Sequence, residues 1–398
     1  MSKGVAITGM GIISSIGNTV EENFQSLIDK KPGISRIKKI DTIHRDAIKV
    51  GEIDLSNDEL IHILNLPESN NYSRTALLAE IAAIEAVKNA NIKDINKYKT
   101  GLISATSVGG MDMTEQFYYS YHEEEKDRKY IDSHSLGDAT SKVAKRLGIT
   151  EFVTTISTAC SSGTNAIMLG ARLIKSGKLD RVIVGGADCL SKFTINGFKT
   201  LMILSKTDCK PFDKNRTGLN LGEAAAFLVL ESDEVVEKED KKVLAYVSGY
   251  ANANDAFHQT ASSEDGEGAT LAMQKALKVA NLSPKDIGYI NAHGTATPNN
   301  DSSESKAILR VFDNDIPSFS STKGFTGHTL AAAGAIEAVY SVLALQNDLV
   351  LPNLNFETPM EGTALTPETE VIRKKIKHVL SNSFGFGGNC STLIFSKA

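Results

Sequence analysis

The chain has 398 residues, of which 41% are hydrophobic and 23% are charged, and its 43 basic and 48 acidic residues give a net charge of −5. This is an ordinary globular composition, large enough to bury a sizeable core. The slight acidic excess, without a basic block, argues against nucleic acid as a partner. No apolar run approaches the ~18 residues that a membrane helix needs, so we expect no membrane insertion.

Four cysteines are spread along the chain and form no CxxC pair. Their spacing suggests neither a disulfide framework nor a zinc site, and we therefore expect no metal and a reducing, cytoplasmic location. The cysteines are Cys160, Cys189, Cys209 and Cys390.

The N-terminal part of the chain alternates predicted strands and helices. A first strand over Val5–Thr8 is followed by a glycine turn, and the dinucleotide-loop pattern that this turn suggests fails because Ser14 stands at its third glycine. Residues 73–90 form an amphipathic pattern that begins at Ser73, which is a typical helix cap. A further strand is predicted over Gly101–Ala105.

The stretch STACSSG places Cys160 where a predicted strand turns into a helix. Phe152–Ser157 is β-branched and aromatic, which favours a short buried strand, and Ala159–Lys175 reads as a buried helix rich in small residues. The unpaired N–H groups and positive dipole end of that helix favour a thiolate, which predicts a lowered thiol pKa. The alternative is that Cys160 is a small buried apolar residue.

The second half of the chain repeats the pattern of the first. The continuous apolar strand Arg181–Ala187 indicates a parallel sheet covered on both faces, and an alanine-rich run ends the first half near residue 231. We therefore predict two like α/β halves, residues 1–240 and 241–398, with a site at their junction. The repeated elements are Val243–Gly249, 269–281, Ile287–Asn291 and the strand and helix that flank His328.

Two histidines in the second half stand in glycine-containing loops. His293 directly follows a predicted strand, and His328 stands at the entrance to a small-residue helix. Neither has metal-ligand spacing to another His or Cys, so the pair indicates proton chemistry or a structural role. The C-terminal loop NSFGFGG at 382–388 either aims a backbone N–H at a developing oxyanion or is a simple β-turn.

Five motifs, taken together and in order, resemble the β-ketoacyl-acyl-carrier-protein synthases of the elongating class. The resemblance covers essentially the whole chain and implies a thiolase-like α/β fold, with two pseudo-duplicated halves in α-β-α-β-α layers. It also implies a homodimer, or a heterodimer with a paralogue. The motifs are TACSSG around Cys160, PFDKNRTG at 211–218, NAHGTAT at 291–297, KGFTGH at 323–328 and NSFGFGG at 382–388.

The same resemblance implies a role for each matched residue. Cys160 is the acylated nucleophile, and His293 and His328 serve decarboxylation of a malonyl extender. Lys323 is an electrostatic lysine with Glu337 as its partner acid. No cofactor is implied, because the substrates ride on the phosphopantetheine of acyl carrier protein. The remaining matches are Thr295 and Thr297 at the pantetheine arm, and the gating Phe386, whose N–H joins that of Cys160 in the oxyanion hole, with Phe384 beside it.

The implied reaction is a decarboxylative Claisen condensation of an acyl group on Cys160 with malonyl-acyl carrier protein, which gives 3-oxoacyl-acyl carrier protein. Departures from the family pattern, such as Asn389 and Cys390 in GFGGNC, leave room for a specialised polyene or polyketide role. The alternatives are an α/β-hydrolase with Ser161 as nucleophile, a thiolase or priming synthase, and a non-catalytic chain-length factor, against which Cys160 argues.

Acyl carrier proteins are acidic, so docking on a chain of net charge −5 requires a local basic patch. Solvated surface charge is the alternative for every such residue. The candidates are Arg128, Lys129, Lys199, Lys206, Lys210 and Arg216.

Overall fold

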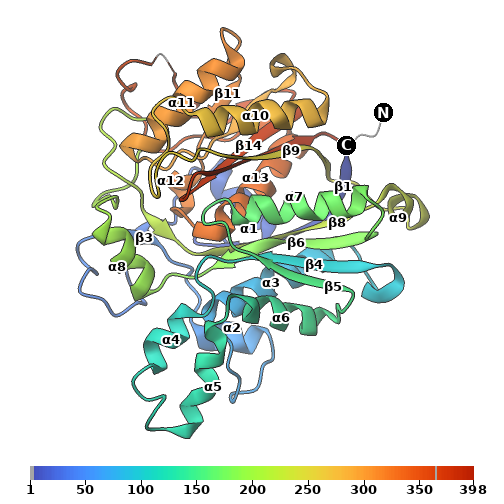
Figure 1. Cartoon of the computed structure of the whole chain (residues 1–398), viewed down its shortest axis with the longest axis vertical. Helices are drawn as coiled ribbons and strands as arrows, with labels where there is room; N and C mark the ends of the chain where they lie inside the picture. The colour runs from blue at the N-terminus through green and yellow to red at the C-terminus, as the bar shows by residue number, and fades with distance from the viewer. Residues whose placement is uncertain (1–3, 364) are drawn as a thin grey trace.

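A ten-stranded sheet organises the computed structural model, which describes residues 4–363 and 365–398 (Figure 1). From one edge to the other its strands are β11 (Ser318–Ser320), β10 (Tyr289–Asn291), β14 (His378–Gly385), β15 (Asn389–Ser396), β9 (Ala245–Asn254), β1 (Val5–Ser14), β8 (Ala224–Glu231), β6 (Arg181–Asp188), β4 (Thr100–Ala105) and β5 (Phe152–Ile156).

The two halves of this sheet have the same topology. In the first half the order is β1-β8-β6-β4-β5, with two antiparallel pairings followed by two parallel ones. In the second half β9-β15-β14-β10-β11 repeats both the order and the directions. The halves are joined where Val5–Ile7 of β1 pair with Ala245–Val247 of β9. The predicted duplication and the α/β, thiolase-like fold class are confirmed.

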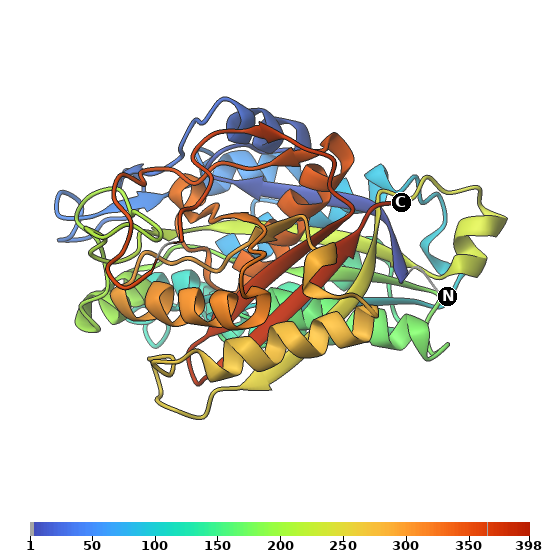
Figure 2. The same ribbon diagram turned by 90° about the horizontal axis from the view of Figure 1, so that it is seen from above.

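Helices complete the five layers. Two helices lie between the half-sheets, and α3 and α6 cover one outer face while α10 and α11 cover the other (Figure 1). Figure 2 shows α10 and α11, in yellow to orange, lying side by side across the C-terminal strands. These helices are α3 (Arg74–Asn89), α6 (Leu136–Leu147), α10 (Glu267–Ala280), α11 (Pro298–Phe312) and the two central ones, α7 (Ser162–Lys175) and α13 (Ala333–Asn347).

Shorter elements surround this frame. They are helices α1 (Val20–Ile28), α2 (Asn57–Ile63), α4 (Met111–Phe117), α5 (Arg128–Ile131), α8 (Lys192–Thr200), α9 (Asp233–Lys238) and α12 (Lys323–Thr326), and strands β2 (Ser35–Arg36), β3 (Lys49–Gly51), β7 (Leu221–Gly222), β12 (Leu349–Val350) and β13 (Ile372–Arg373).

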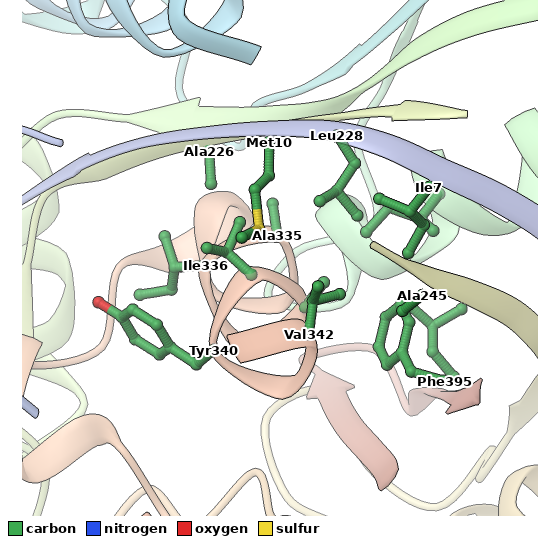
Figure 3. Packing of buried hydrophobic residues seen from close by; sticks show 14 of the residues in the cluster. Ile7, Met10, Ala226, Leu228, Ala245, Ala335, Ile336, Tyr340, Val342 and Phe395 are labelled. Atoms are coloured by element: carbon green, nitrogen blue, oxygen red, sulfur yellow. The ribbon is translucent and has the colours of Figure 1, made fainter. Parts of the chain in front are cut away.

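The largest apolar core surrounds α13, which is buried on all sides (Figure 3). Ile336 and Val342 of this helix pack among residues of β1, β8, β9 and β15. The expectation that no apolar run approaches the length of a membrane helix is wrong, because Leu330–Asn347 is long and apolar enough by length and composition. However, 89% of this stretch is buried inside the protein, as expected for a core helix.

The first turns of α7 and α13 meet at a close approach that only glycine permits. A Cβ atom on Gly334 of α13 would lie 2.0 Å from Thr164 Oγ1, and one on Gly163 of α7 would lie 2.8 Å from Ala331 O. The small residues seen in both segments therefore bring the N-terminal ends of these helices together. This crossing places the turn before α7 beside the loop before α13.

Three predictions about strands need correction. The glycines after Thr8 do not form a turn, because β1 continues to Ser14 and Gly9 and Gly11 let α3 approach: a Cβ on Gly11 would lie 2.2 Å from Ala82 O. β6 is parallel only to β4 and antiparallel to β8. β5 is not buried, since it forms the edge of the sheet and Val153 is 40% exposed.

Candidate active site

Cys160 lies in a strained turn between β5 and α7. Ala159, directly before it, has a φ of +52°, in the left-handed region that non-glycine residues seldom adopt. The turn is closed by a hydrogen bond from Ser162 N–H to Ala159 O (3.1 Å). Cys160 is buried and lines a cavity. The strained backbone thus directs the thiol into the cavity while α7 runs away from it.

The environment of the thiol does not support the predicted thiolate. Burial raises the pKa of Cys160 to about 11, and this rise is only partly opposed by the charge of Lys323 and by the Phe386 N–H. Although the helix N-terminus favours an anion, the loss of solvent destabilises a buried thiolate by more than the helix, Lys323 and the Phe386 N–H stabilise it. The expectation of a lowered pKa is therefore wrong for the resting site, where Cys160 is a neutral thiol.

The two predicted histidines face each other in the same cavity. Their ring centroids are 5.3 Å apart and the rings are nearly perpendicular, at 86°. His328 Nδ1 accepts a hydrogen bond from Leu330 N–H (3.2 Å), and His293 Nδ1 lies 3.3 Å from Lys323 Nζ, an ammonium that can only donate. In each neutral ring the proton is therefore on Nε2.

Lys323 and Glu337 lie behind the histidines as a buried ion pair. Lys323 Nζ donates to Glu337 Oε1, and Ser383 Oγ lies 3.5 Å from Glu337 Oε2. The pKa of both histidines lies well below the usual value, first because they are buried and second because of the charge on Lys323. Both imidazoles are therefore neutral hydrogen-bond donors at neutral pH.

The glycine loop between β14 and β15 is a turn that also directs a backbone N–H into the site. It is the turn between the last two strands, and its Phe386 N–H is directed at the Cys160 thiol. The ring of Phe386 stacks on Phe198 at 5.8 Å, and Phe384 lies 5.6 Å from the ring of His293. Two backbone N–H groups, of Cys160 and Phe386, are thus available for an oxyanion.

The cavity that these groups share has a volume of about 230 Å³. Thr295 and Thr297 line it, with their hydroxyl oxygens 2.9 Å apart. Cys390 also lines this cavity. Within residues 4–363 and 365–398, no cluster of three or more His, Cys, Asp or Glu side chains is arranged to hold a metal ion. The structure therefore brings together all nine predicted site residues, seven on the cavity wall and two behind it.

Models of two known domains match most of the chain. The N-terminal domain of β-ketoacyl synthase matches residues 2–235, and the C-terminal domain of β-ketoacyl synthase matches residues 244–357. The chain belongs to the β-ketoacyl synthase family. A ketoacyl synthase is an acyltransferase that joins two acyl units through a new carbon–carbon bond, and the cavity contains a nucleophile and proton donors suited to that reaction.

Individual relatives agree with this assignment. The ketoacyl synthase is 34% identical to 3-oxoacyl-[acyl-carrier-protein] synthase 2 of Staphylococcus aureus (strain COL), over 100% of this chain and 99% of the relative. Its structure is similar to the ishigamide ketosynthase/chain length factor (TM-score 0.93, 28% identity, 100% of both chains). It is also similar to a ketosynthase (ApeO) in complex with its chain length factor (ApeC) from Xenorhabdus doucetiae (TM-score 0.87, 33% identity, 100% of this chain and 98% of that one).

Two carboxylates that support the site were missed by the sequence analysis. Glu304 accepts hydrogen bonds from the N–H groups of His293 (2.9 Å) and Gly294 (2.8 Å), and burial raises its pKa to about 7. Asp301 accepts from Ala296 N–H (3.2 Å). Both lie on α11. The sequence feature that could have identified them is the presence of acidic residues one to two helical turns after the NAHGTAT motif.

The geometry argues against the hydrolase alternative. Ser161 has no exposed surface, and its hydroxyl is directed away from the cavity to Thr158 O (2.7 Å) and Asn389 Oδ1 (2.6 Å). A nucleophilic serine needs a base within hydrogen-bond reach and an open path to substrate. In this turn only Cys160 faces the cavity that the histidines line.

Proposed function

We propose that this ketoacyl synthase condenses an acyl group, held as a thioester on Cys160, with malonyl-acyl carrier protein to give 3-oxoacyl-acyl carrier protein. The observation that carries the proposal is that two neutral imidazoles, each with its proton on Nε2, share one cavity with a buried thiol. Its setting is fatty-acid synthesis or a related polyene or polyketide pathway, and its location is the cytoplasm.

Loading begins when the thiol proton leaves and Cys160 Sγ attacks the carbonyl of an acyl thioester. The oxyanion is held by the N–H groups of Cys160 and Phe386. When the tetrahedral adduct collapses, the carbon–sulfur bond to the carrier breaks and the carrier thiolate takes up the proton. The acyl group is then attached to Cys160, and Thr295 and Thr297 hold the pantetheine arm.

Condensation follows when malonyl-acyl carrier protein replaces the first carrier. Loss of CO2 leaves an enolate whose oxygen accepts hydrogen bonds from Nε2–H of His293 and His328. The enolate carbon attacks the acyl carbonyl and the new carbon–carbon bond forms. The carbon–sulfur bond to Cys160 breaks, and its thiolate takes up a proton from water. Lys323, paired with Glu337, keeps the proton of His293 on Nε2.

The proposed docking surface for acyl carrier protein is narrower than the sequence suggested. Arg128, Lys199 and Lys206 remain as candidates, of which Arg128 and Lys206 are exposed and Lys199 is half-buried. The other three are engaged in the fold: Lys129 donates to Ser69 O, Lys210 pairs with Glu357, and Arg216 donates to Pro298 O and Ser302 Oγ. Arg216 thus holds the start of α11, next to Thr297, and is not part of the proposed docking surface.

We further propose that the protein is a dimer, with itself or with a paralogue, formed along the free edge of β5. Edge strands offer unpaired N–H and C=O groups that a second chain can extend. The exposed apolar residues near this edge, Val153 and Leu136, are 40% and 37% exposed. A similar ketosynthase forms a complex with a chain length factor, which supports pairing with a like chain.

The test of the proposed roles is Cys160→Ala. Condensation should be abolished, because no acyl group can be attached, while malonyl-acyl carrier protein should still lose CO2 slowly because the histidines remain. CO2 release and product formation would be measured separately, with Cys189→Ala, at a buried cysteine that does not line the cavity, as the control for loss of a buried thiol. A folded Cys160→Ala protein that releases no CO2 would contradict the roles given to the histidines.

A further inference from the structure

A polar cluster contacts the Cys160 turn outside the cavity that the histidines line. We call it the asparagine cluster: Asn165 on α7, Asn252 on β9, and Asn389 with Ser391 on β15, joined by Ser161. These residues come from both halves of the chain. None of them lines the cavity, so the reaction steps described above do not use them.

Asn389 Oδ1 is the centre of the cluster and is used only as an acceptor. The nitrogen atoms of two asparagines donate to it, Asn252 Nδ2 at 2.8 Å and Asn165 Nδ2 at 2.9 Å. Ser161 Oγ lies at 2.6 Å and Ser391 Oγ at 3.3 Å. The one Ser391 hydroxyl proton is better placed on Asn165 Oδ1, at 2.8 Å. Three donors therefore act on Asn389 Oδ1: the two amides and the Ser161 hydroxyl, which is shared with Thr158 O. They fix the oxygen more strongly than a single bond would, because moving it weakens all of them together.

On one side the cluster holds the turn that carries the nucleophile. Ser161 follows Cys160 directly, and its hydroxyl is 2.7 Å from Thr158 O. Asn165 Nδ2 also donates to Thr158 Oγ1 (2.8 Å). The residues on both sides of Cys160 are therefore tied to Asn389, and with them the backbone N–H of Cys160.

On the other side the cluster holds the glycine loop. Asn389 is the first residue of β15 and pairs with Gly385, which directly precedes Phe386. Gly385 packs on the nucleophile turn so closely that a Cβ there would lie 2.8 Å from Thr158 O and 3.2 Å from Cys160 N. One side chain thus links the two segments that supply the N–H groups of Cys160 and Phe386.

We propose that Asn389 is a positioning residue that sets the separation of the two N–H groups of the oxyanion hole. This inference rests on the proposed function, because it takes the Cys160 and Phe386 N–H groups as the oxyanion donors. An oxyanion forms at these donors during acyl loading and condensation, whereas the enolate formed by decarboxylation is stabilised by the histidines. Asn389 therefore acts on acyl loading and on carbon–carbon bond formation, and it leaves decarboxylation unchanged.

Asn389→Leu, Asn389→Asp and the control Asn89→Leu test this role. Asn89 Oδ1 also accepts a backbone hydrogen bond, from Met10 N–H (3.0 Å), but lies at the end of α3, on the outer face of the sheet. Asn389→Leu should lower kcat for acylation of Cys160 by about 10²-fold, the effect of losing one oxyanion donor. KM for acyl-acyl carrier protein and the rate of CO2 release from malonyl-acyl carrier protein should be unchanged.

Asn389→Asp keeps an oxygen that accepts from the two amides and from Ser161, and it should recover most of the lost acylation rate. Asn89→Leu should load at the wild-type rate. The inference is overturned if Asn389→Leu loads as fast as wild type, or if it loses loading and decarboxylation equally. If Asn389→Leu does not fold, an Asn389→Asp protein that is folded but loads about 10²-fold slower than wild type overturns it as well. Failure of the proposed function would differ, because wild type itself would then carry no acyl group on Cys160.

Discussion

The chemistry of His328 is set by one hydrogen bond that its sequence context could not reveal. The glycines and the strand-end position identified His328 and His293 as candidates, but not which ring nitrogen carries the proton. That depends on Leu330 N–H and on Lys323, which the fold brings to Nδ1 of each ring. The prediction of a lowered thiol pKa was wrong for the same reason. A helix N-terminus can be identified from sequence, but the burial that raises the pKa of Cys160 to about 11 cannot.

The buried histidines predict a loss of stability in mild acid. Because the pKa of His328 is lowered in the folded state, the unfolded chain binds a proton below about pH 6.5 that the folded protein does not bind. The free energy of unfolding therefore falls as the pH falls below about 6.5, by up to about 1.4 kcal/mol per pH unit for each such histidine. Above about pH 6.5 both the folded and the unfolded protein have a neutral His328, and the free energy of unfolding no longer depends on pH through this residue.

His328→Gln should reduce this dependence, since glutamine does not titrate. Urea unfolding at several pH values between 7.5 and 5 would be compared for wild type, His328→Gln and the exposed control His122→Gln. A difference in slope of about 1 kcal/mol per pH unit between His328→Gln and wild type is expected. Identical slopes in all three proteins would show that His328 titrates normally in the fold.

At the scale of elements, the sequence predicted whether a segment is a helix or a strand, but not which other elements pack against it. The strand over 152–156 and the helix from residue 74 were correctly identified, because β-branched runs and capped amphipathic patterns are local signals. Whether β5 is central or at the edge depends on which strands pair with it, and these are distant in sequence. The glycines of β1 likewise suggested a turn, because the sequence does not show that α3 packs closely against them.

If the dimer forms along the free edge of β5, a charged residue in the middle of this strand should prevent dimer formation. Val153→Lys places an ammonium on the exposed edge, where pairing of two strands would bury it, and natural edge strands use lysine to block such pairing. Light scattering after gel filtration should show about twice 42.8 kDa for wild type and a shift towards the monomer for the variant. Val279→Lys, at a 45% exposed position on α10, is the matched control. An unchanged dimer in Val153→Lys would place the interface elsewhere.

For the whole molecule, the duplication was the most useful sequence signal. Each half supplies the same strands in the same order. From this repeat the sequence predicted that Cys160 and the histidines come from opposite halves, and in the structure they line one cavity. The asparagine cluster could not be predicted, because its members stand on three separate elements and only the crossing of the halves brings Asn165, Asn252 and Asn389 together. Polar networks of this kind have no local pattern.

The most direct measurement follows one acyl group through both half-reactions. The purified protein would be incubated with acyl-acyl carrier protein, its mass and the modified peptide determined, and malonyl-acyl carrier protein then added. The account predicts an acyl group on the Cys160 peptide, followed by its transfer to a 3-oxoacyl-acyl carrier protein two carbons longer, with one CO2 released for each product. Release of free fatty acid without an acyl group on Cys160, or acylation of Ser161 instead, would contradict it.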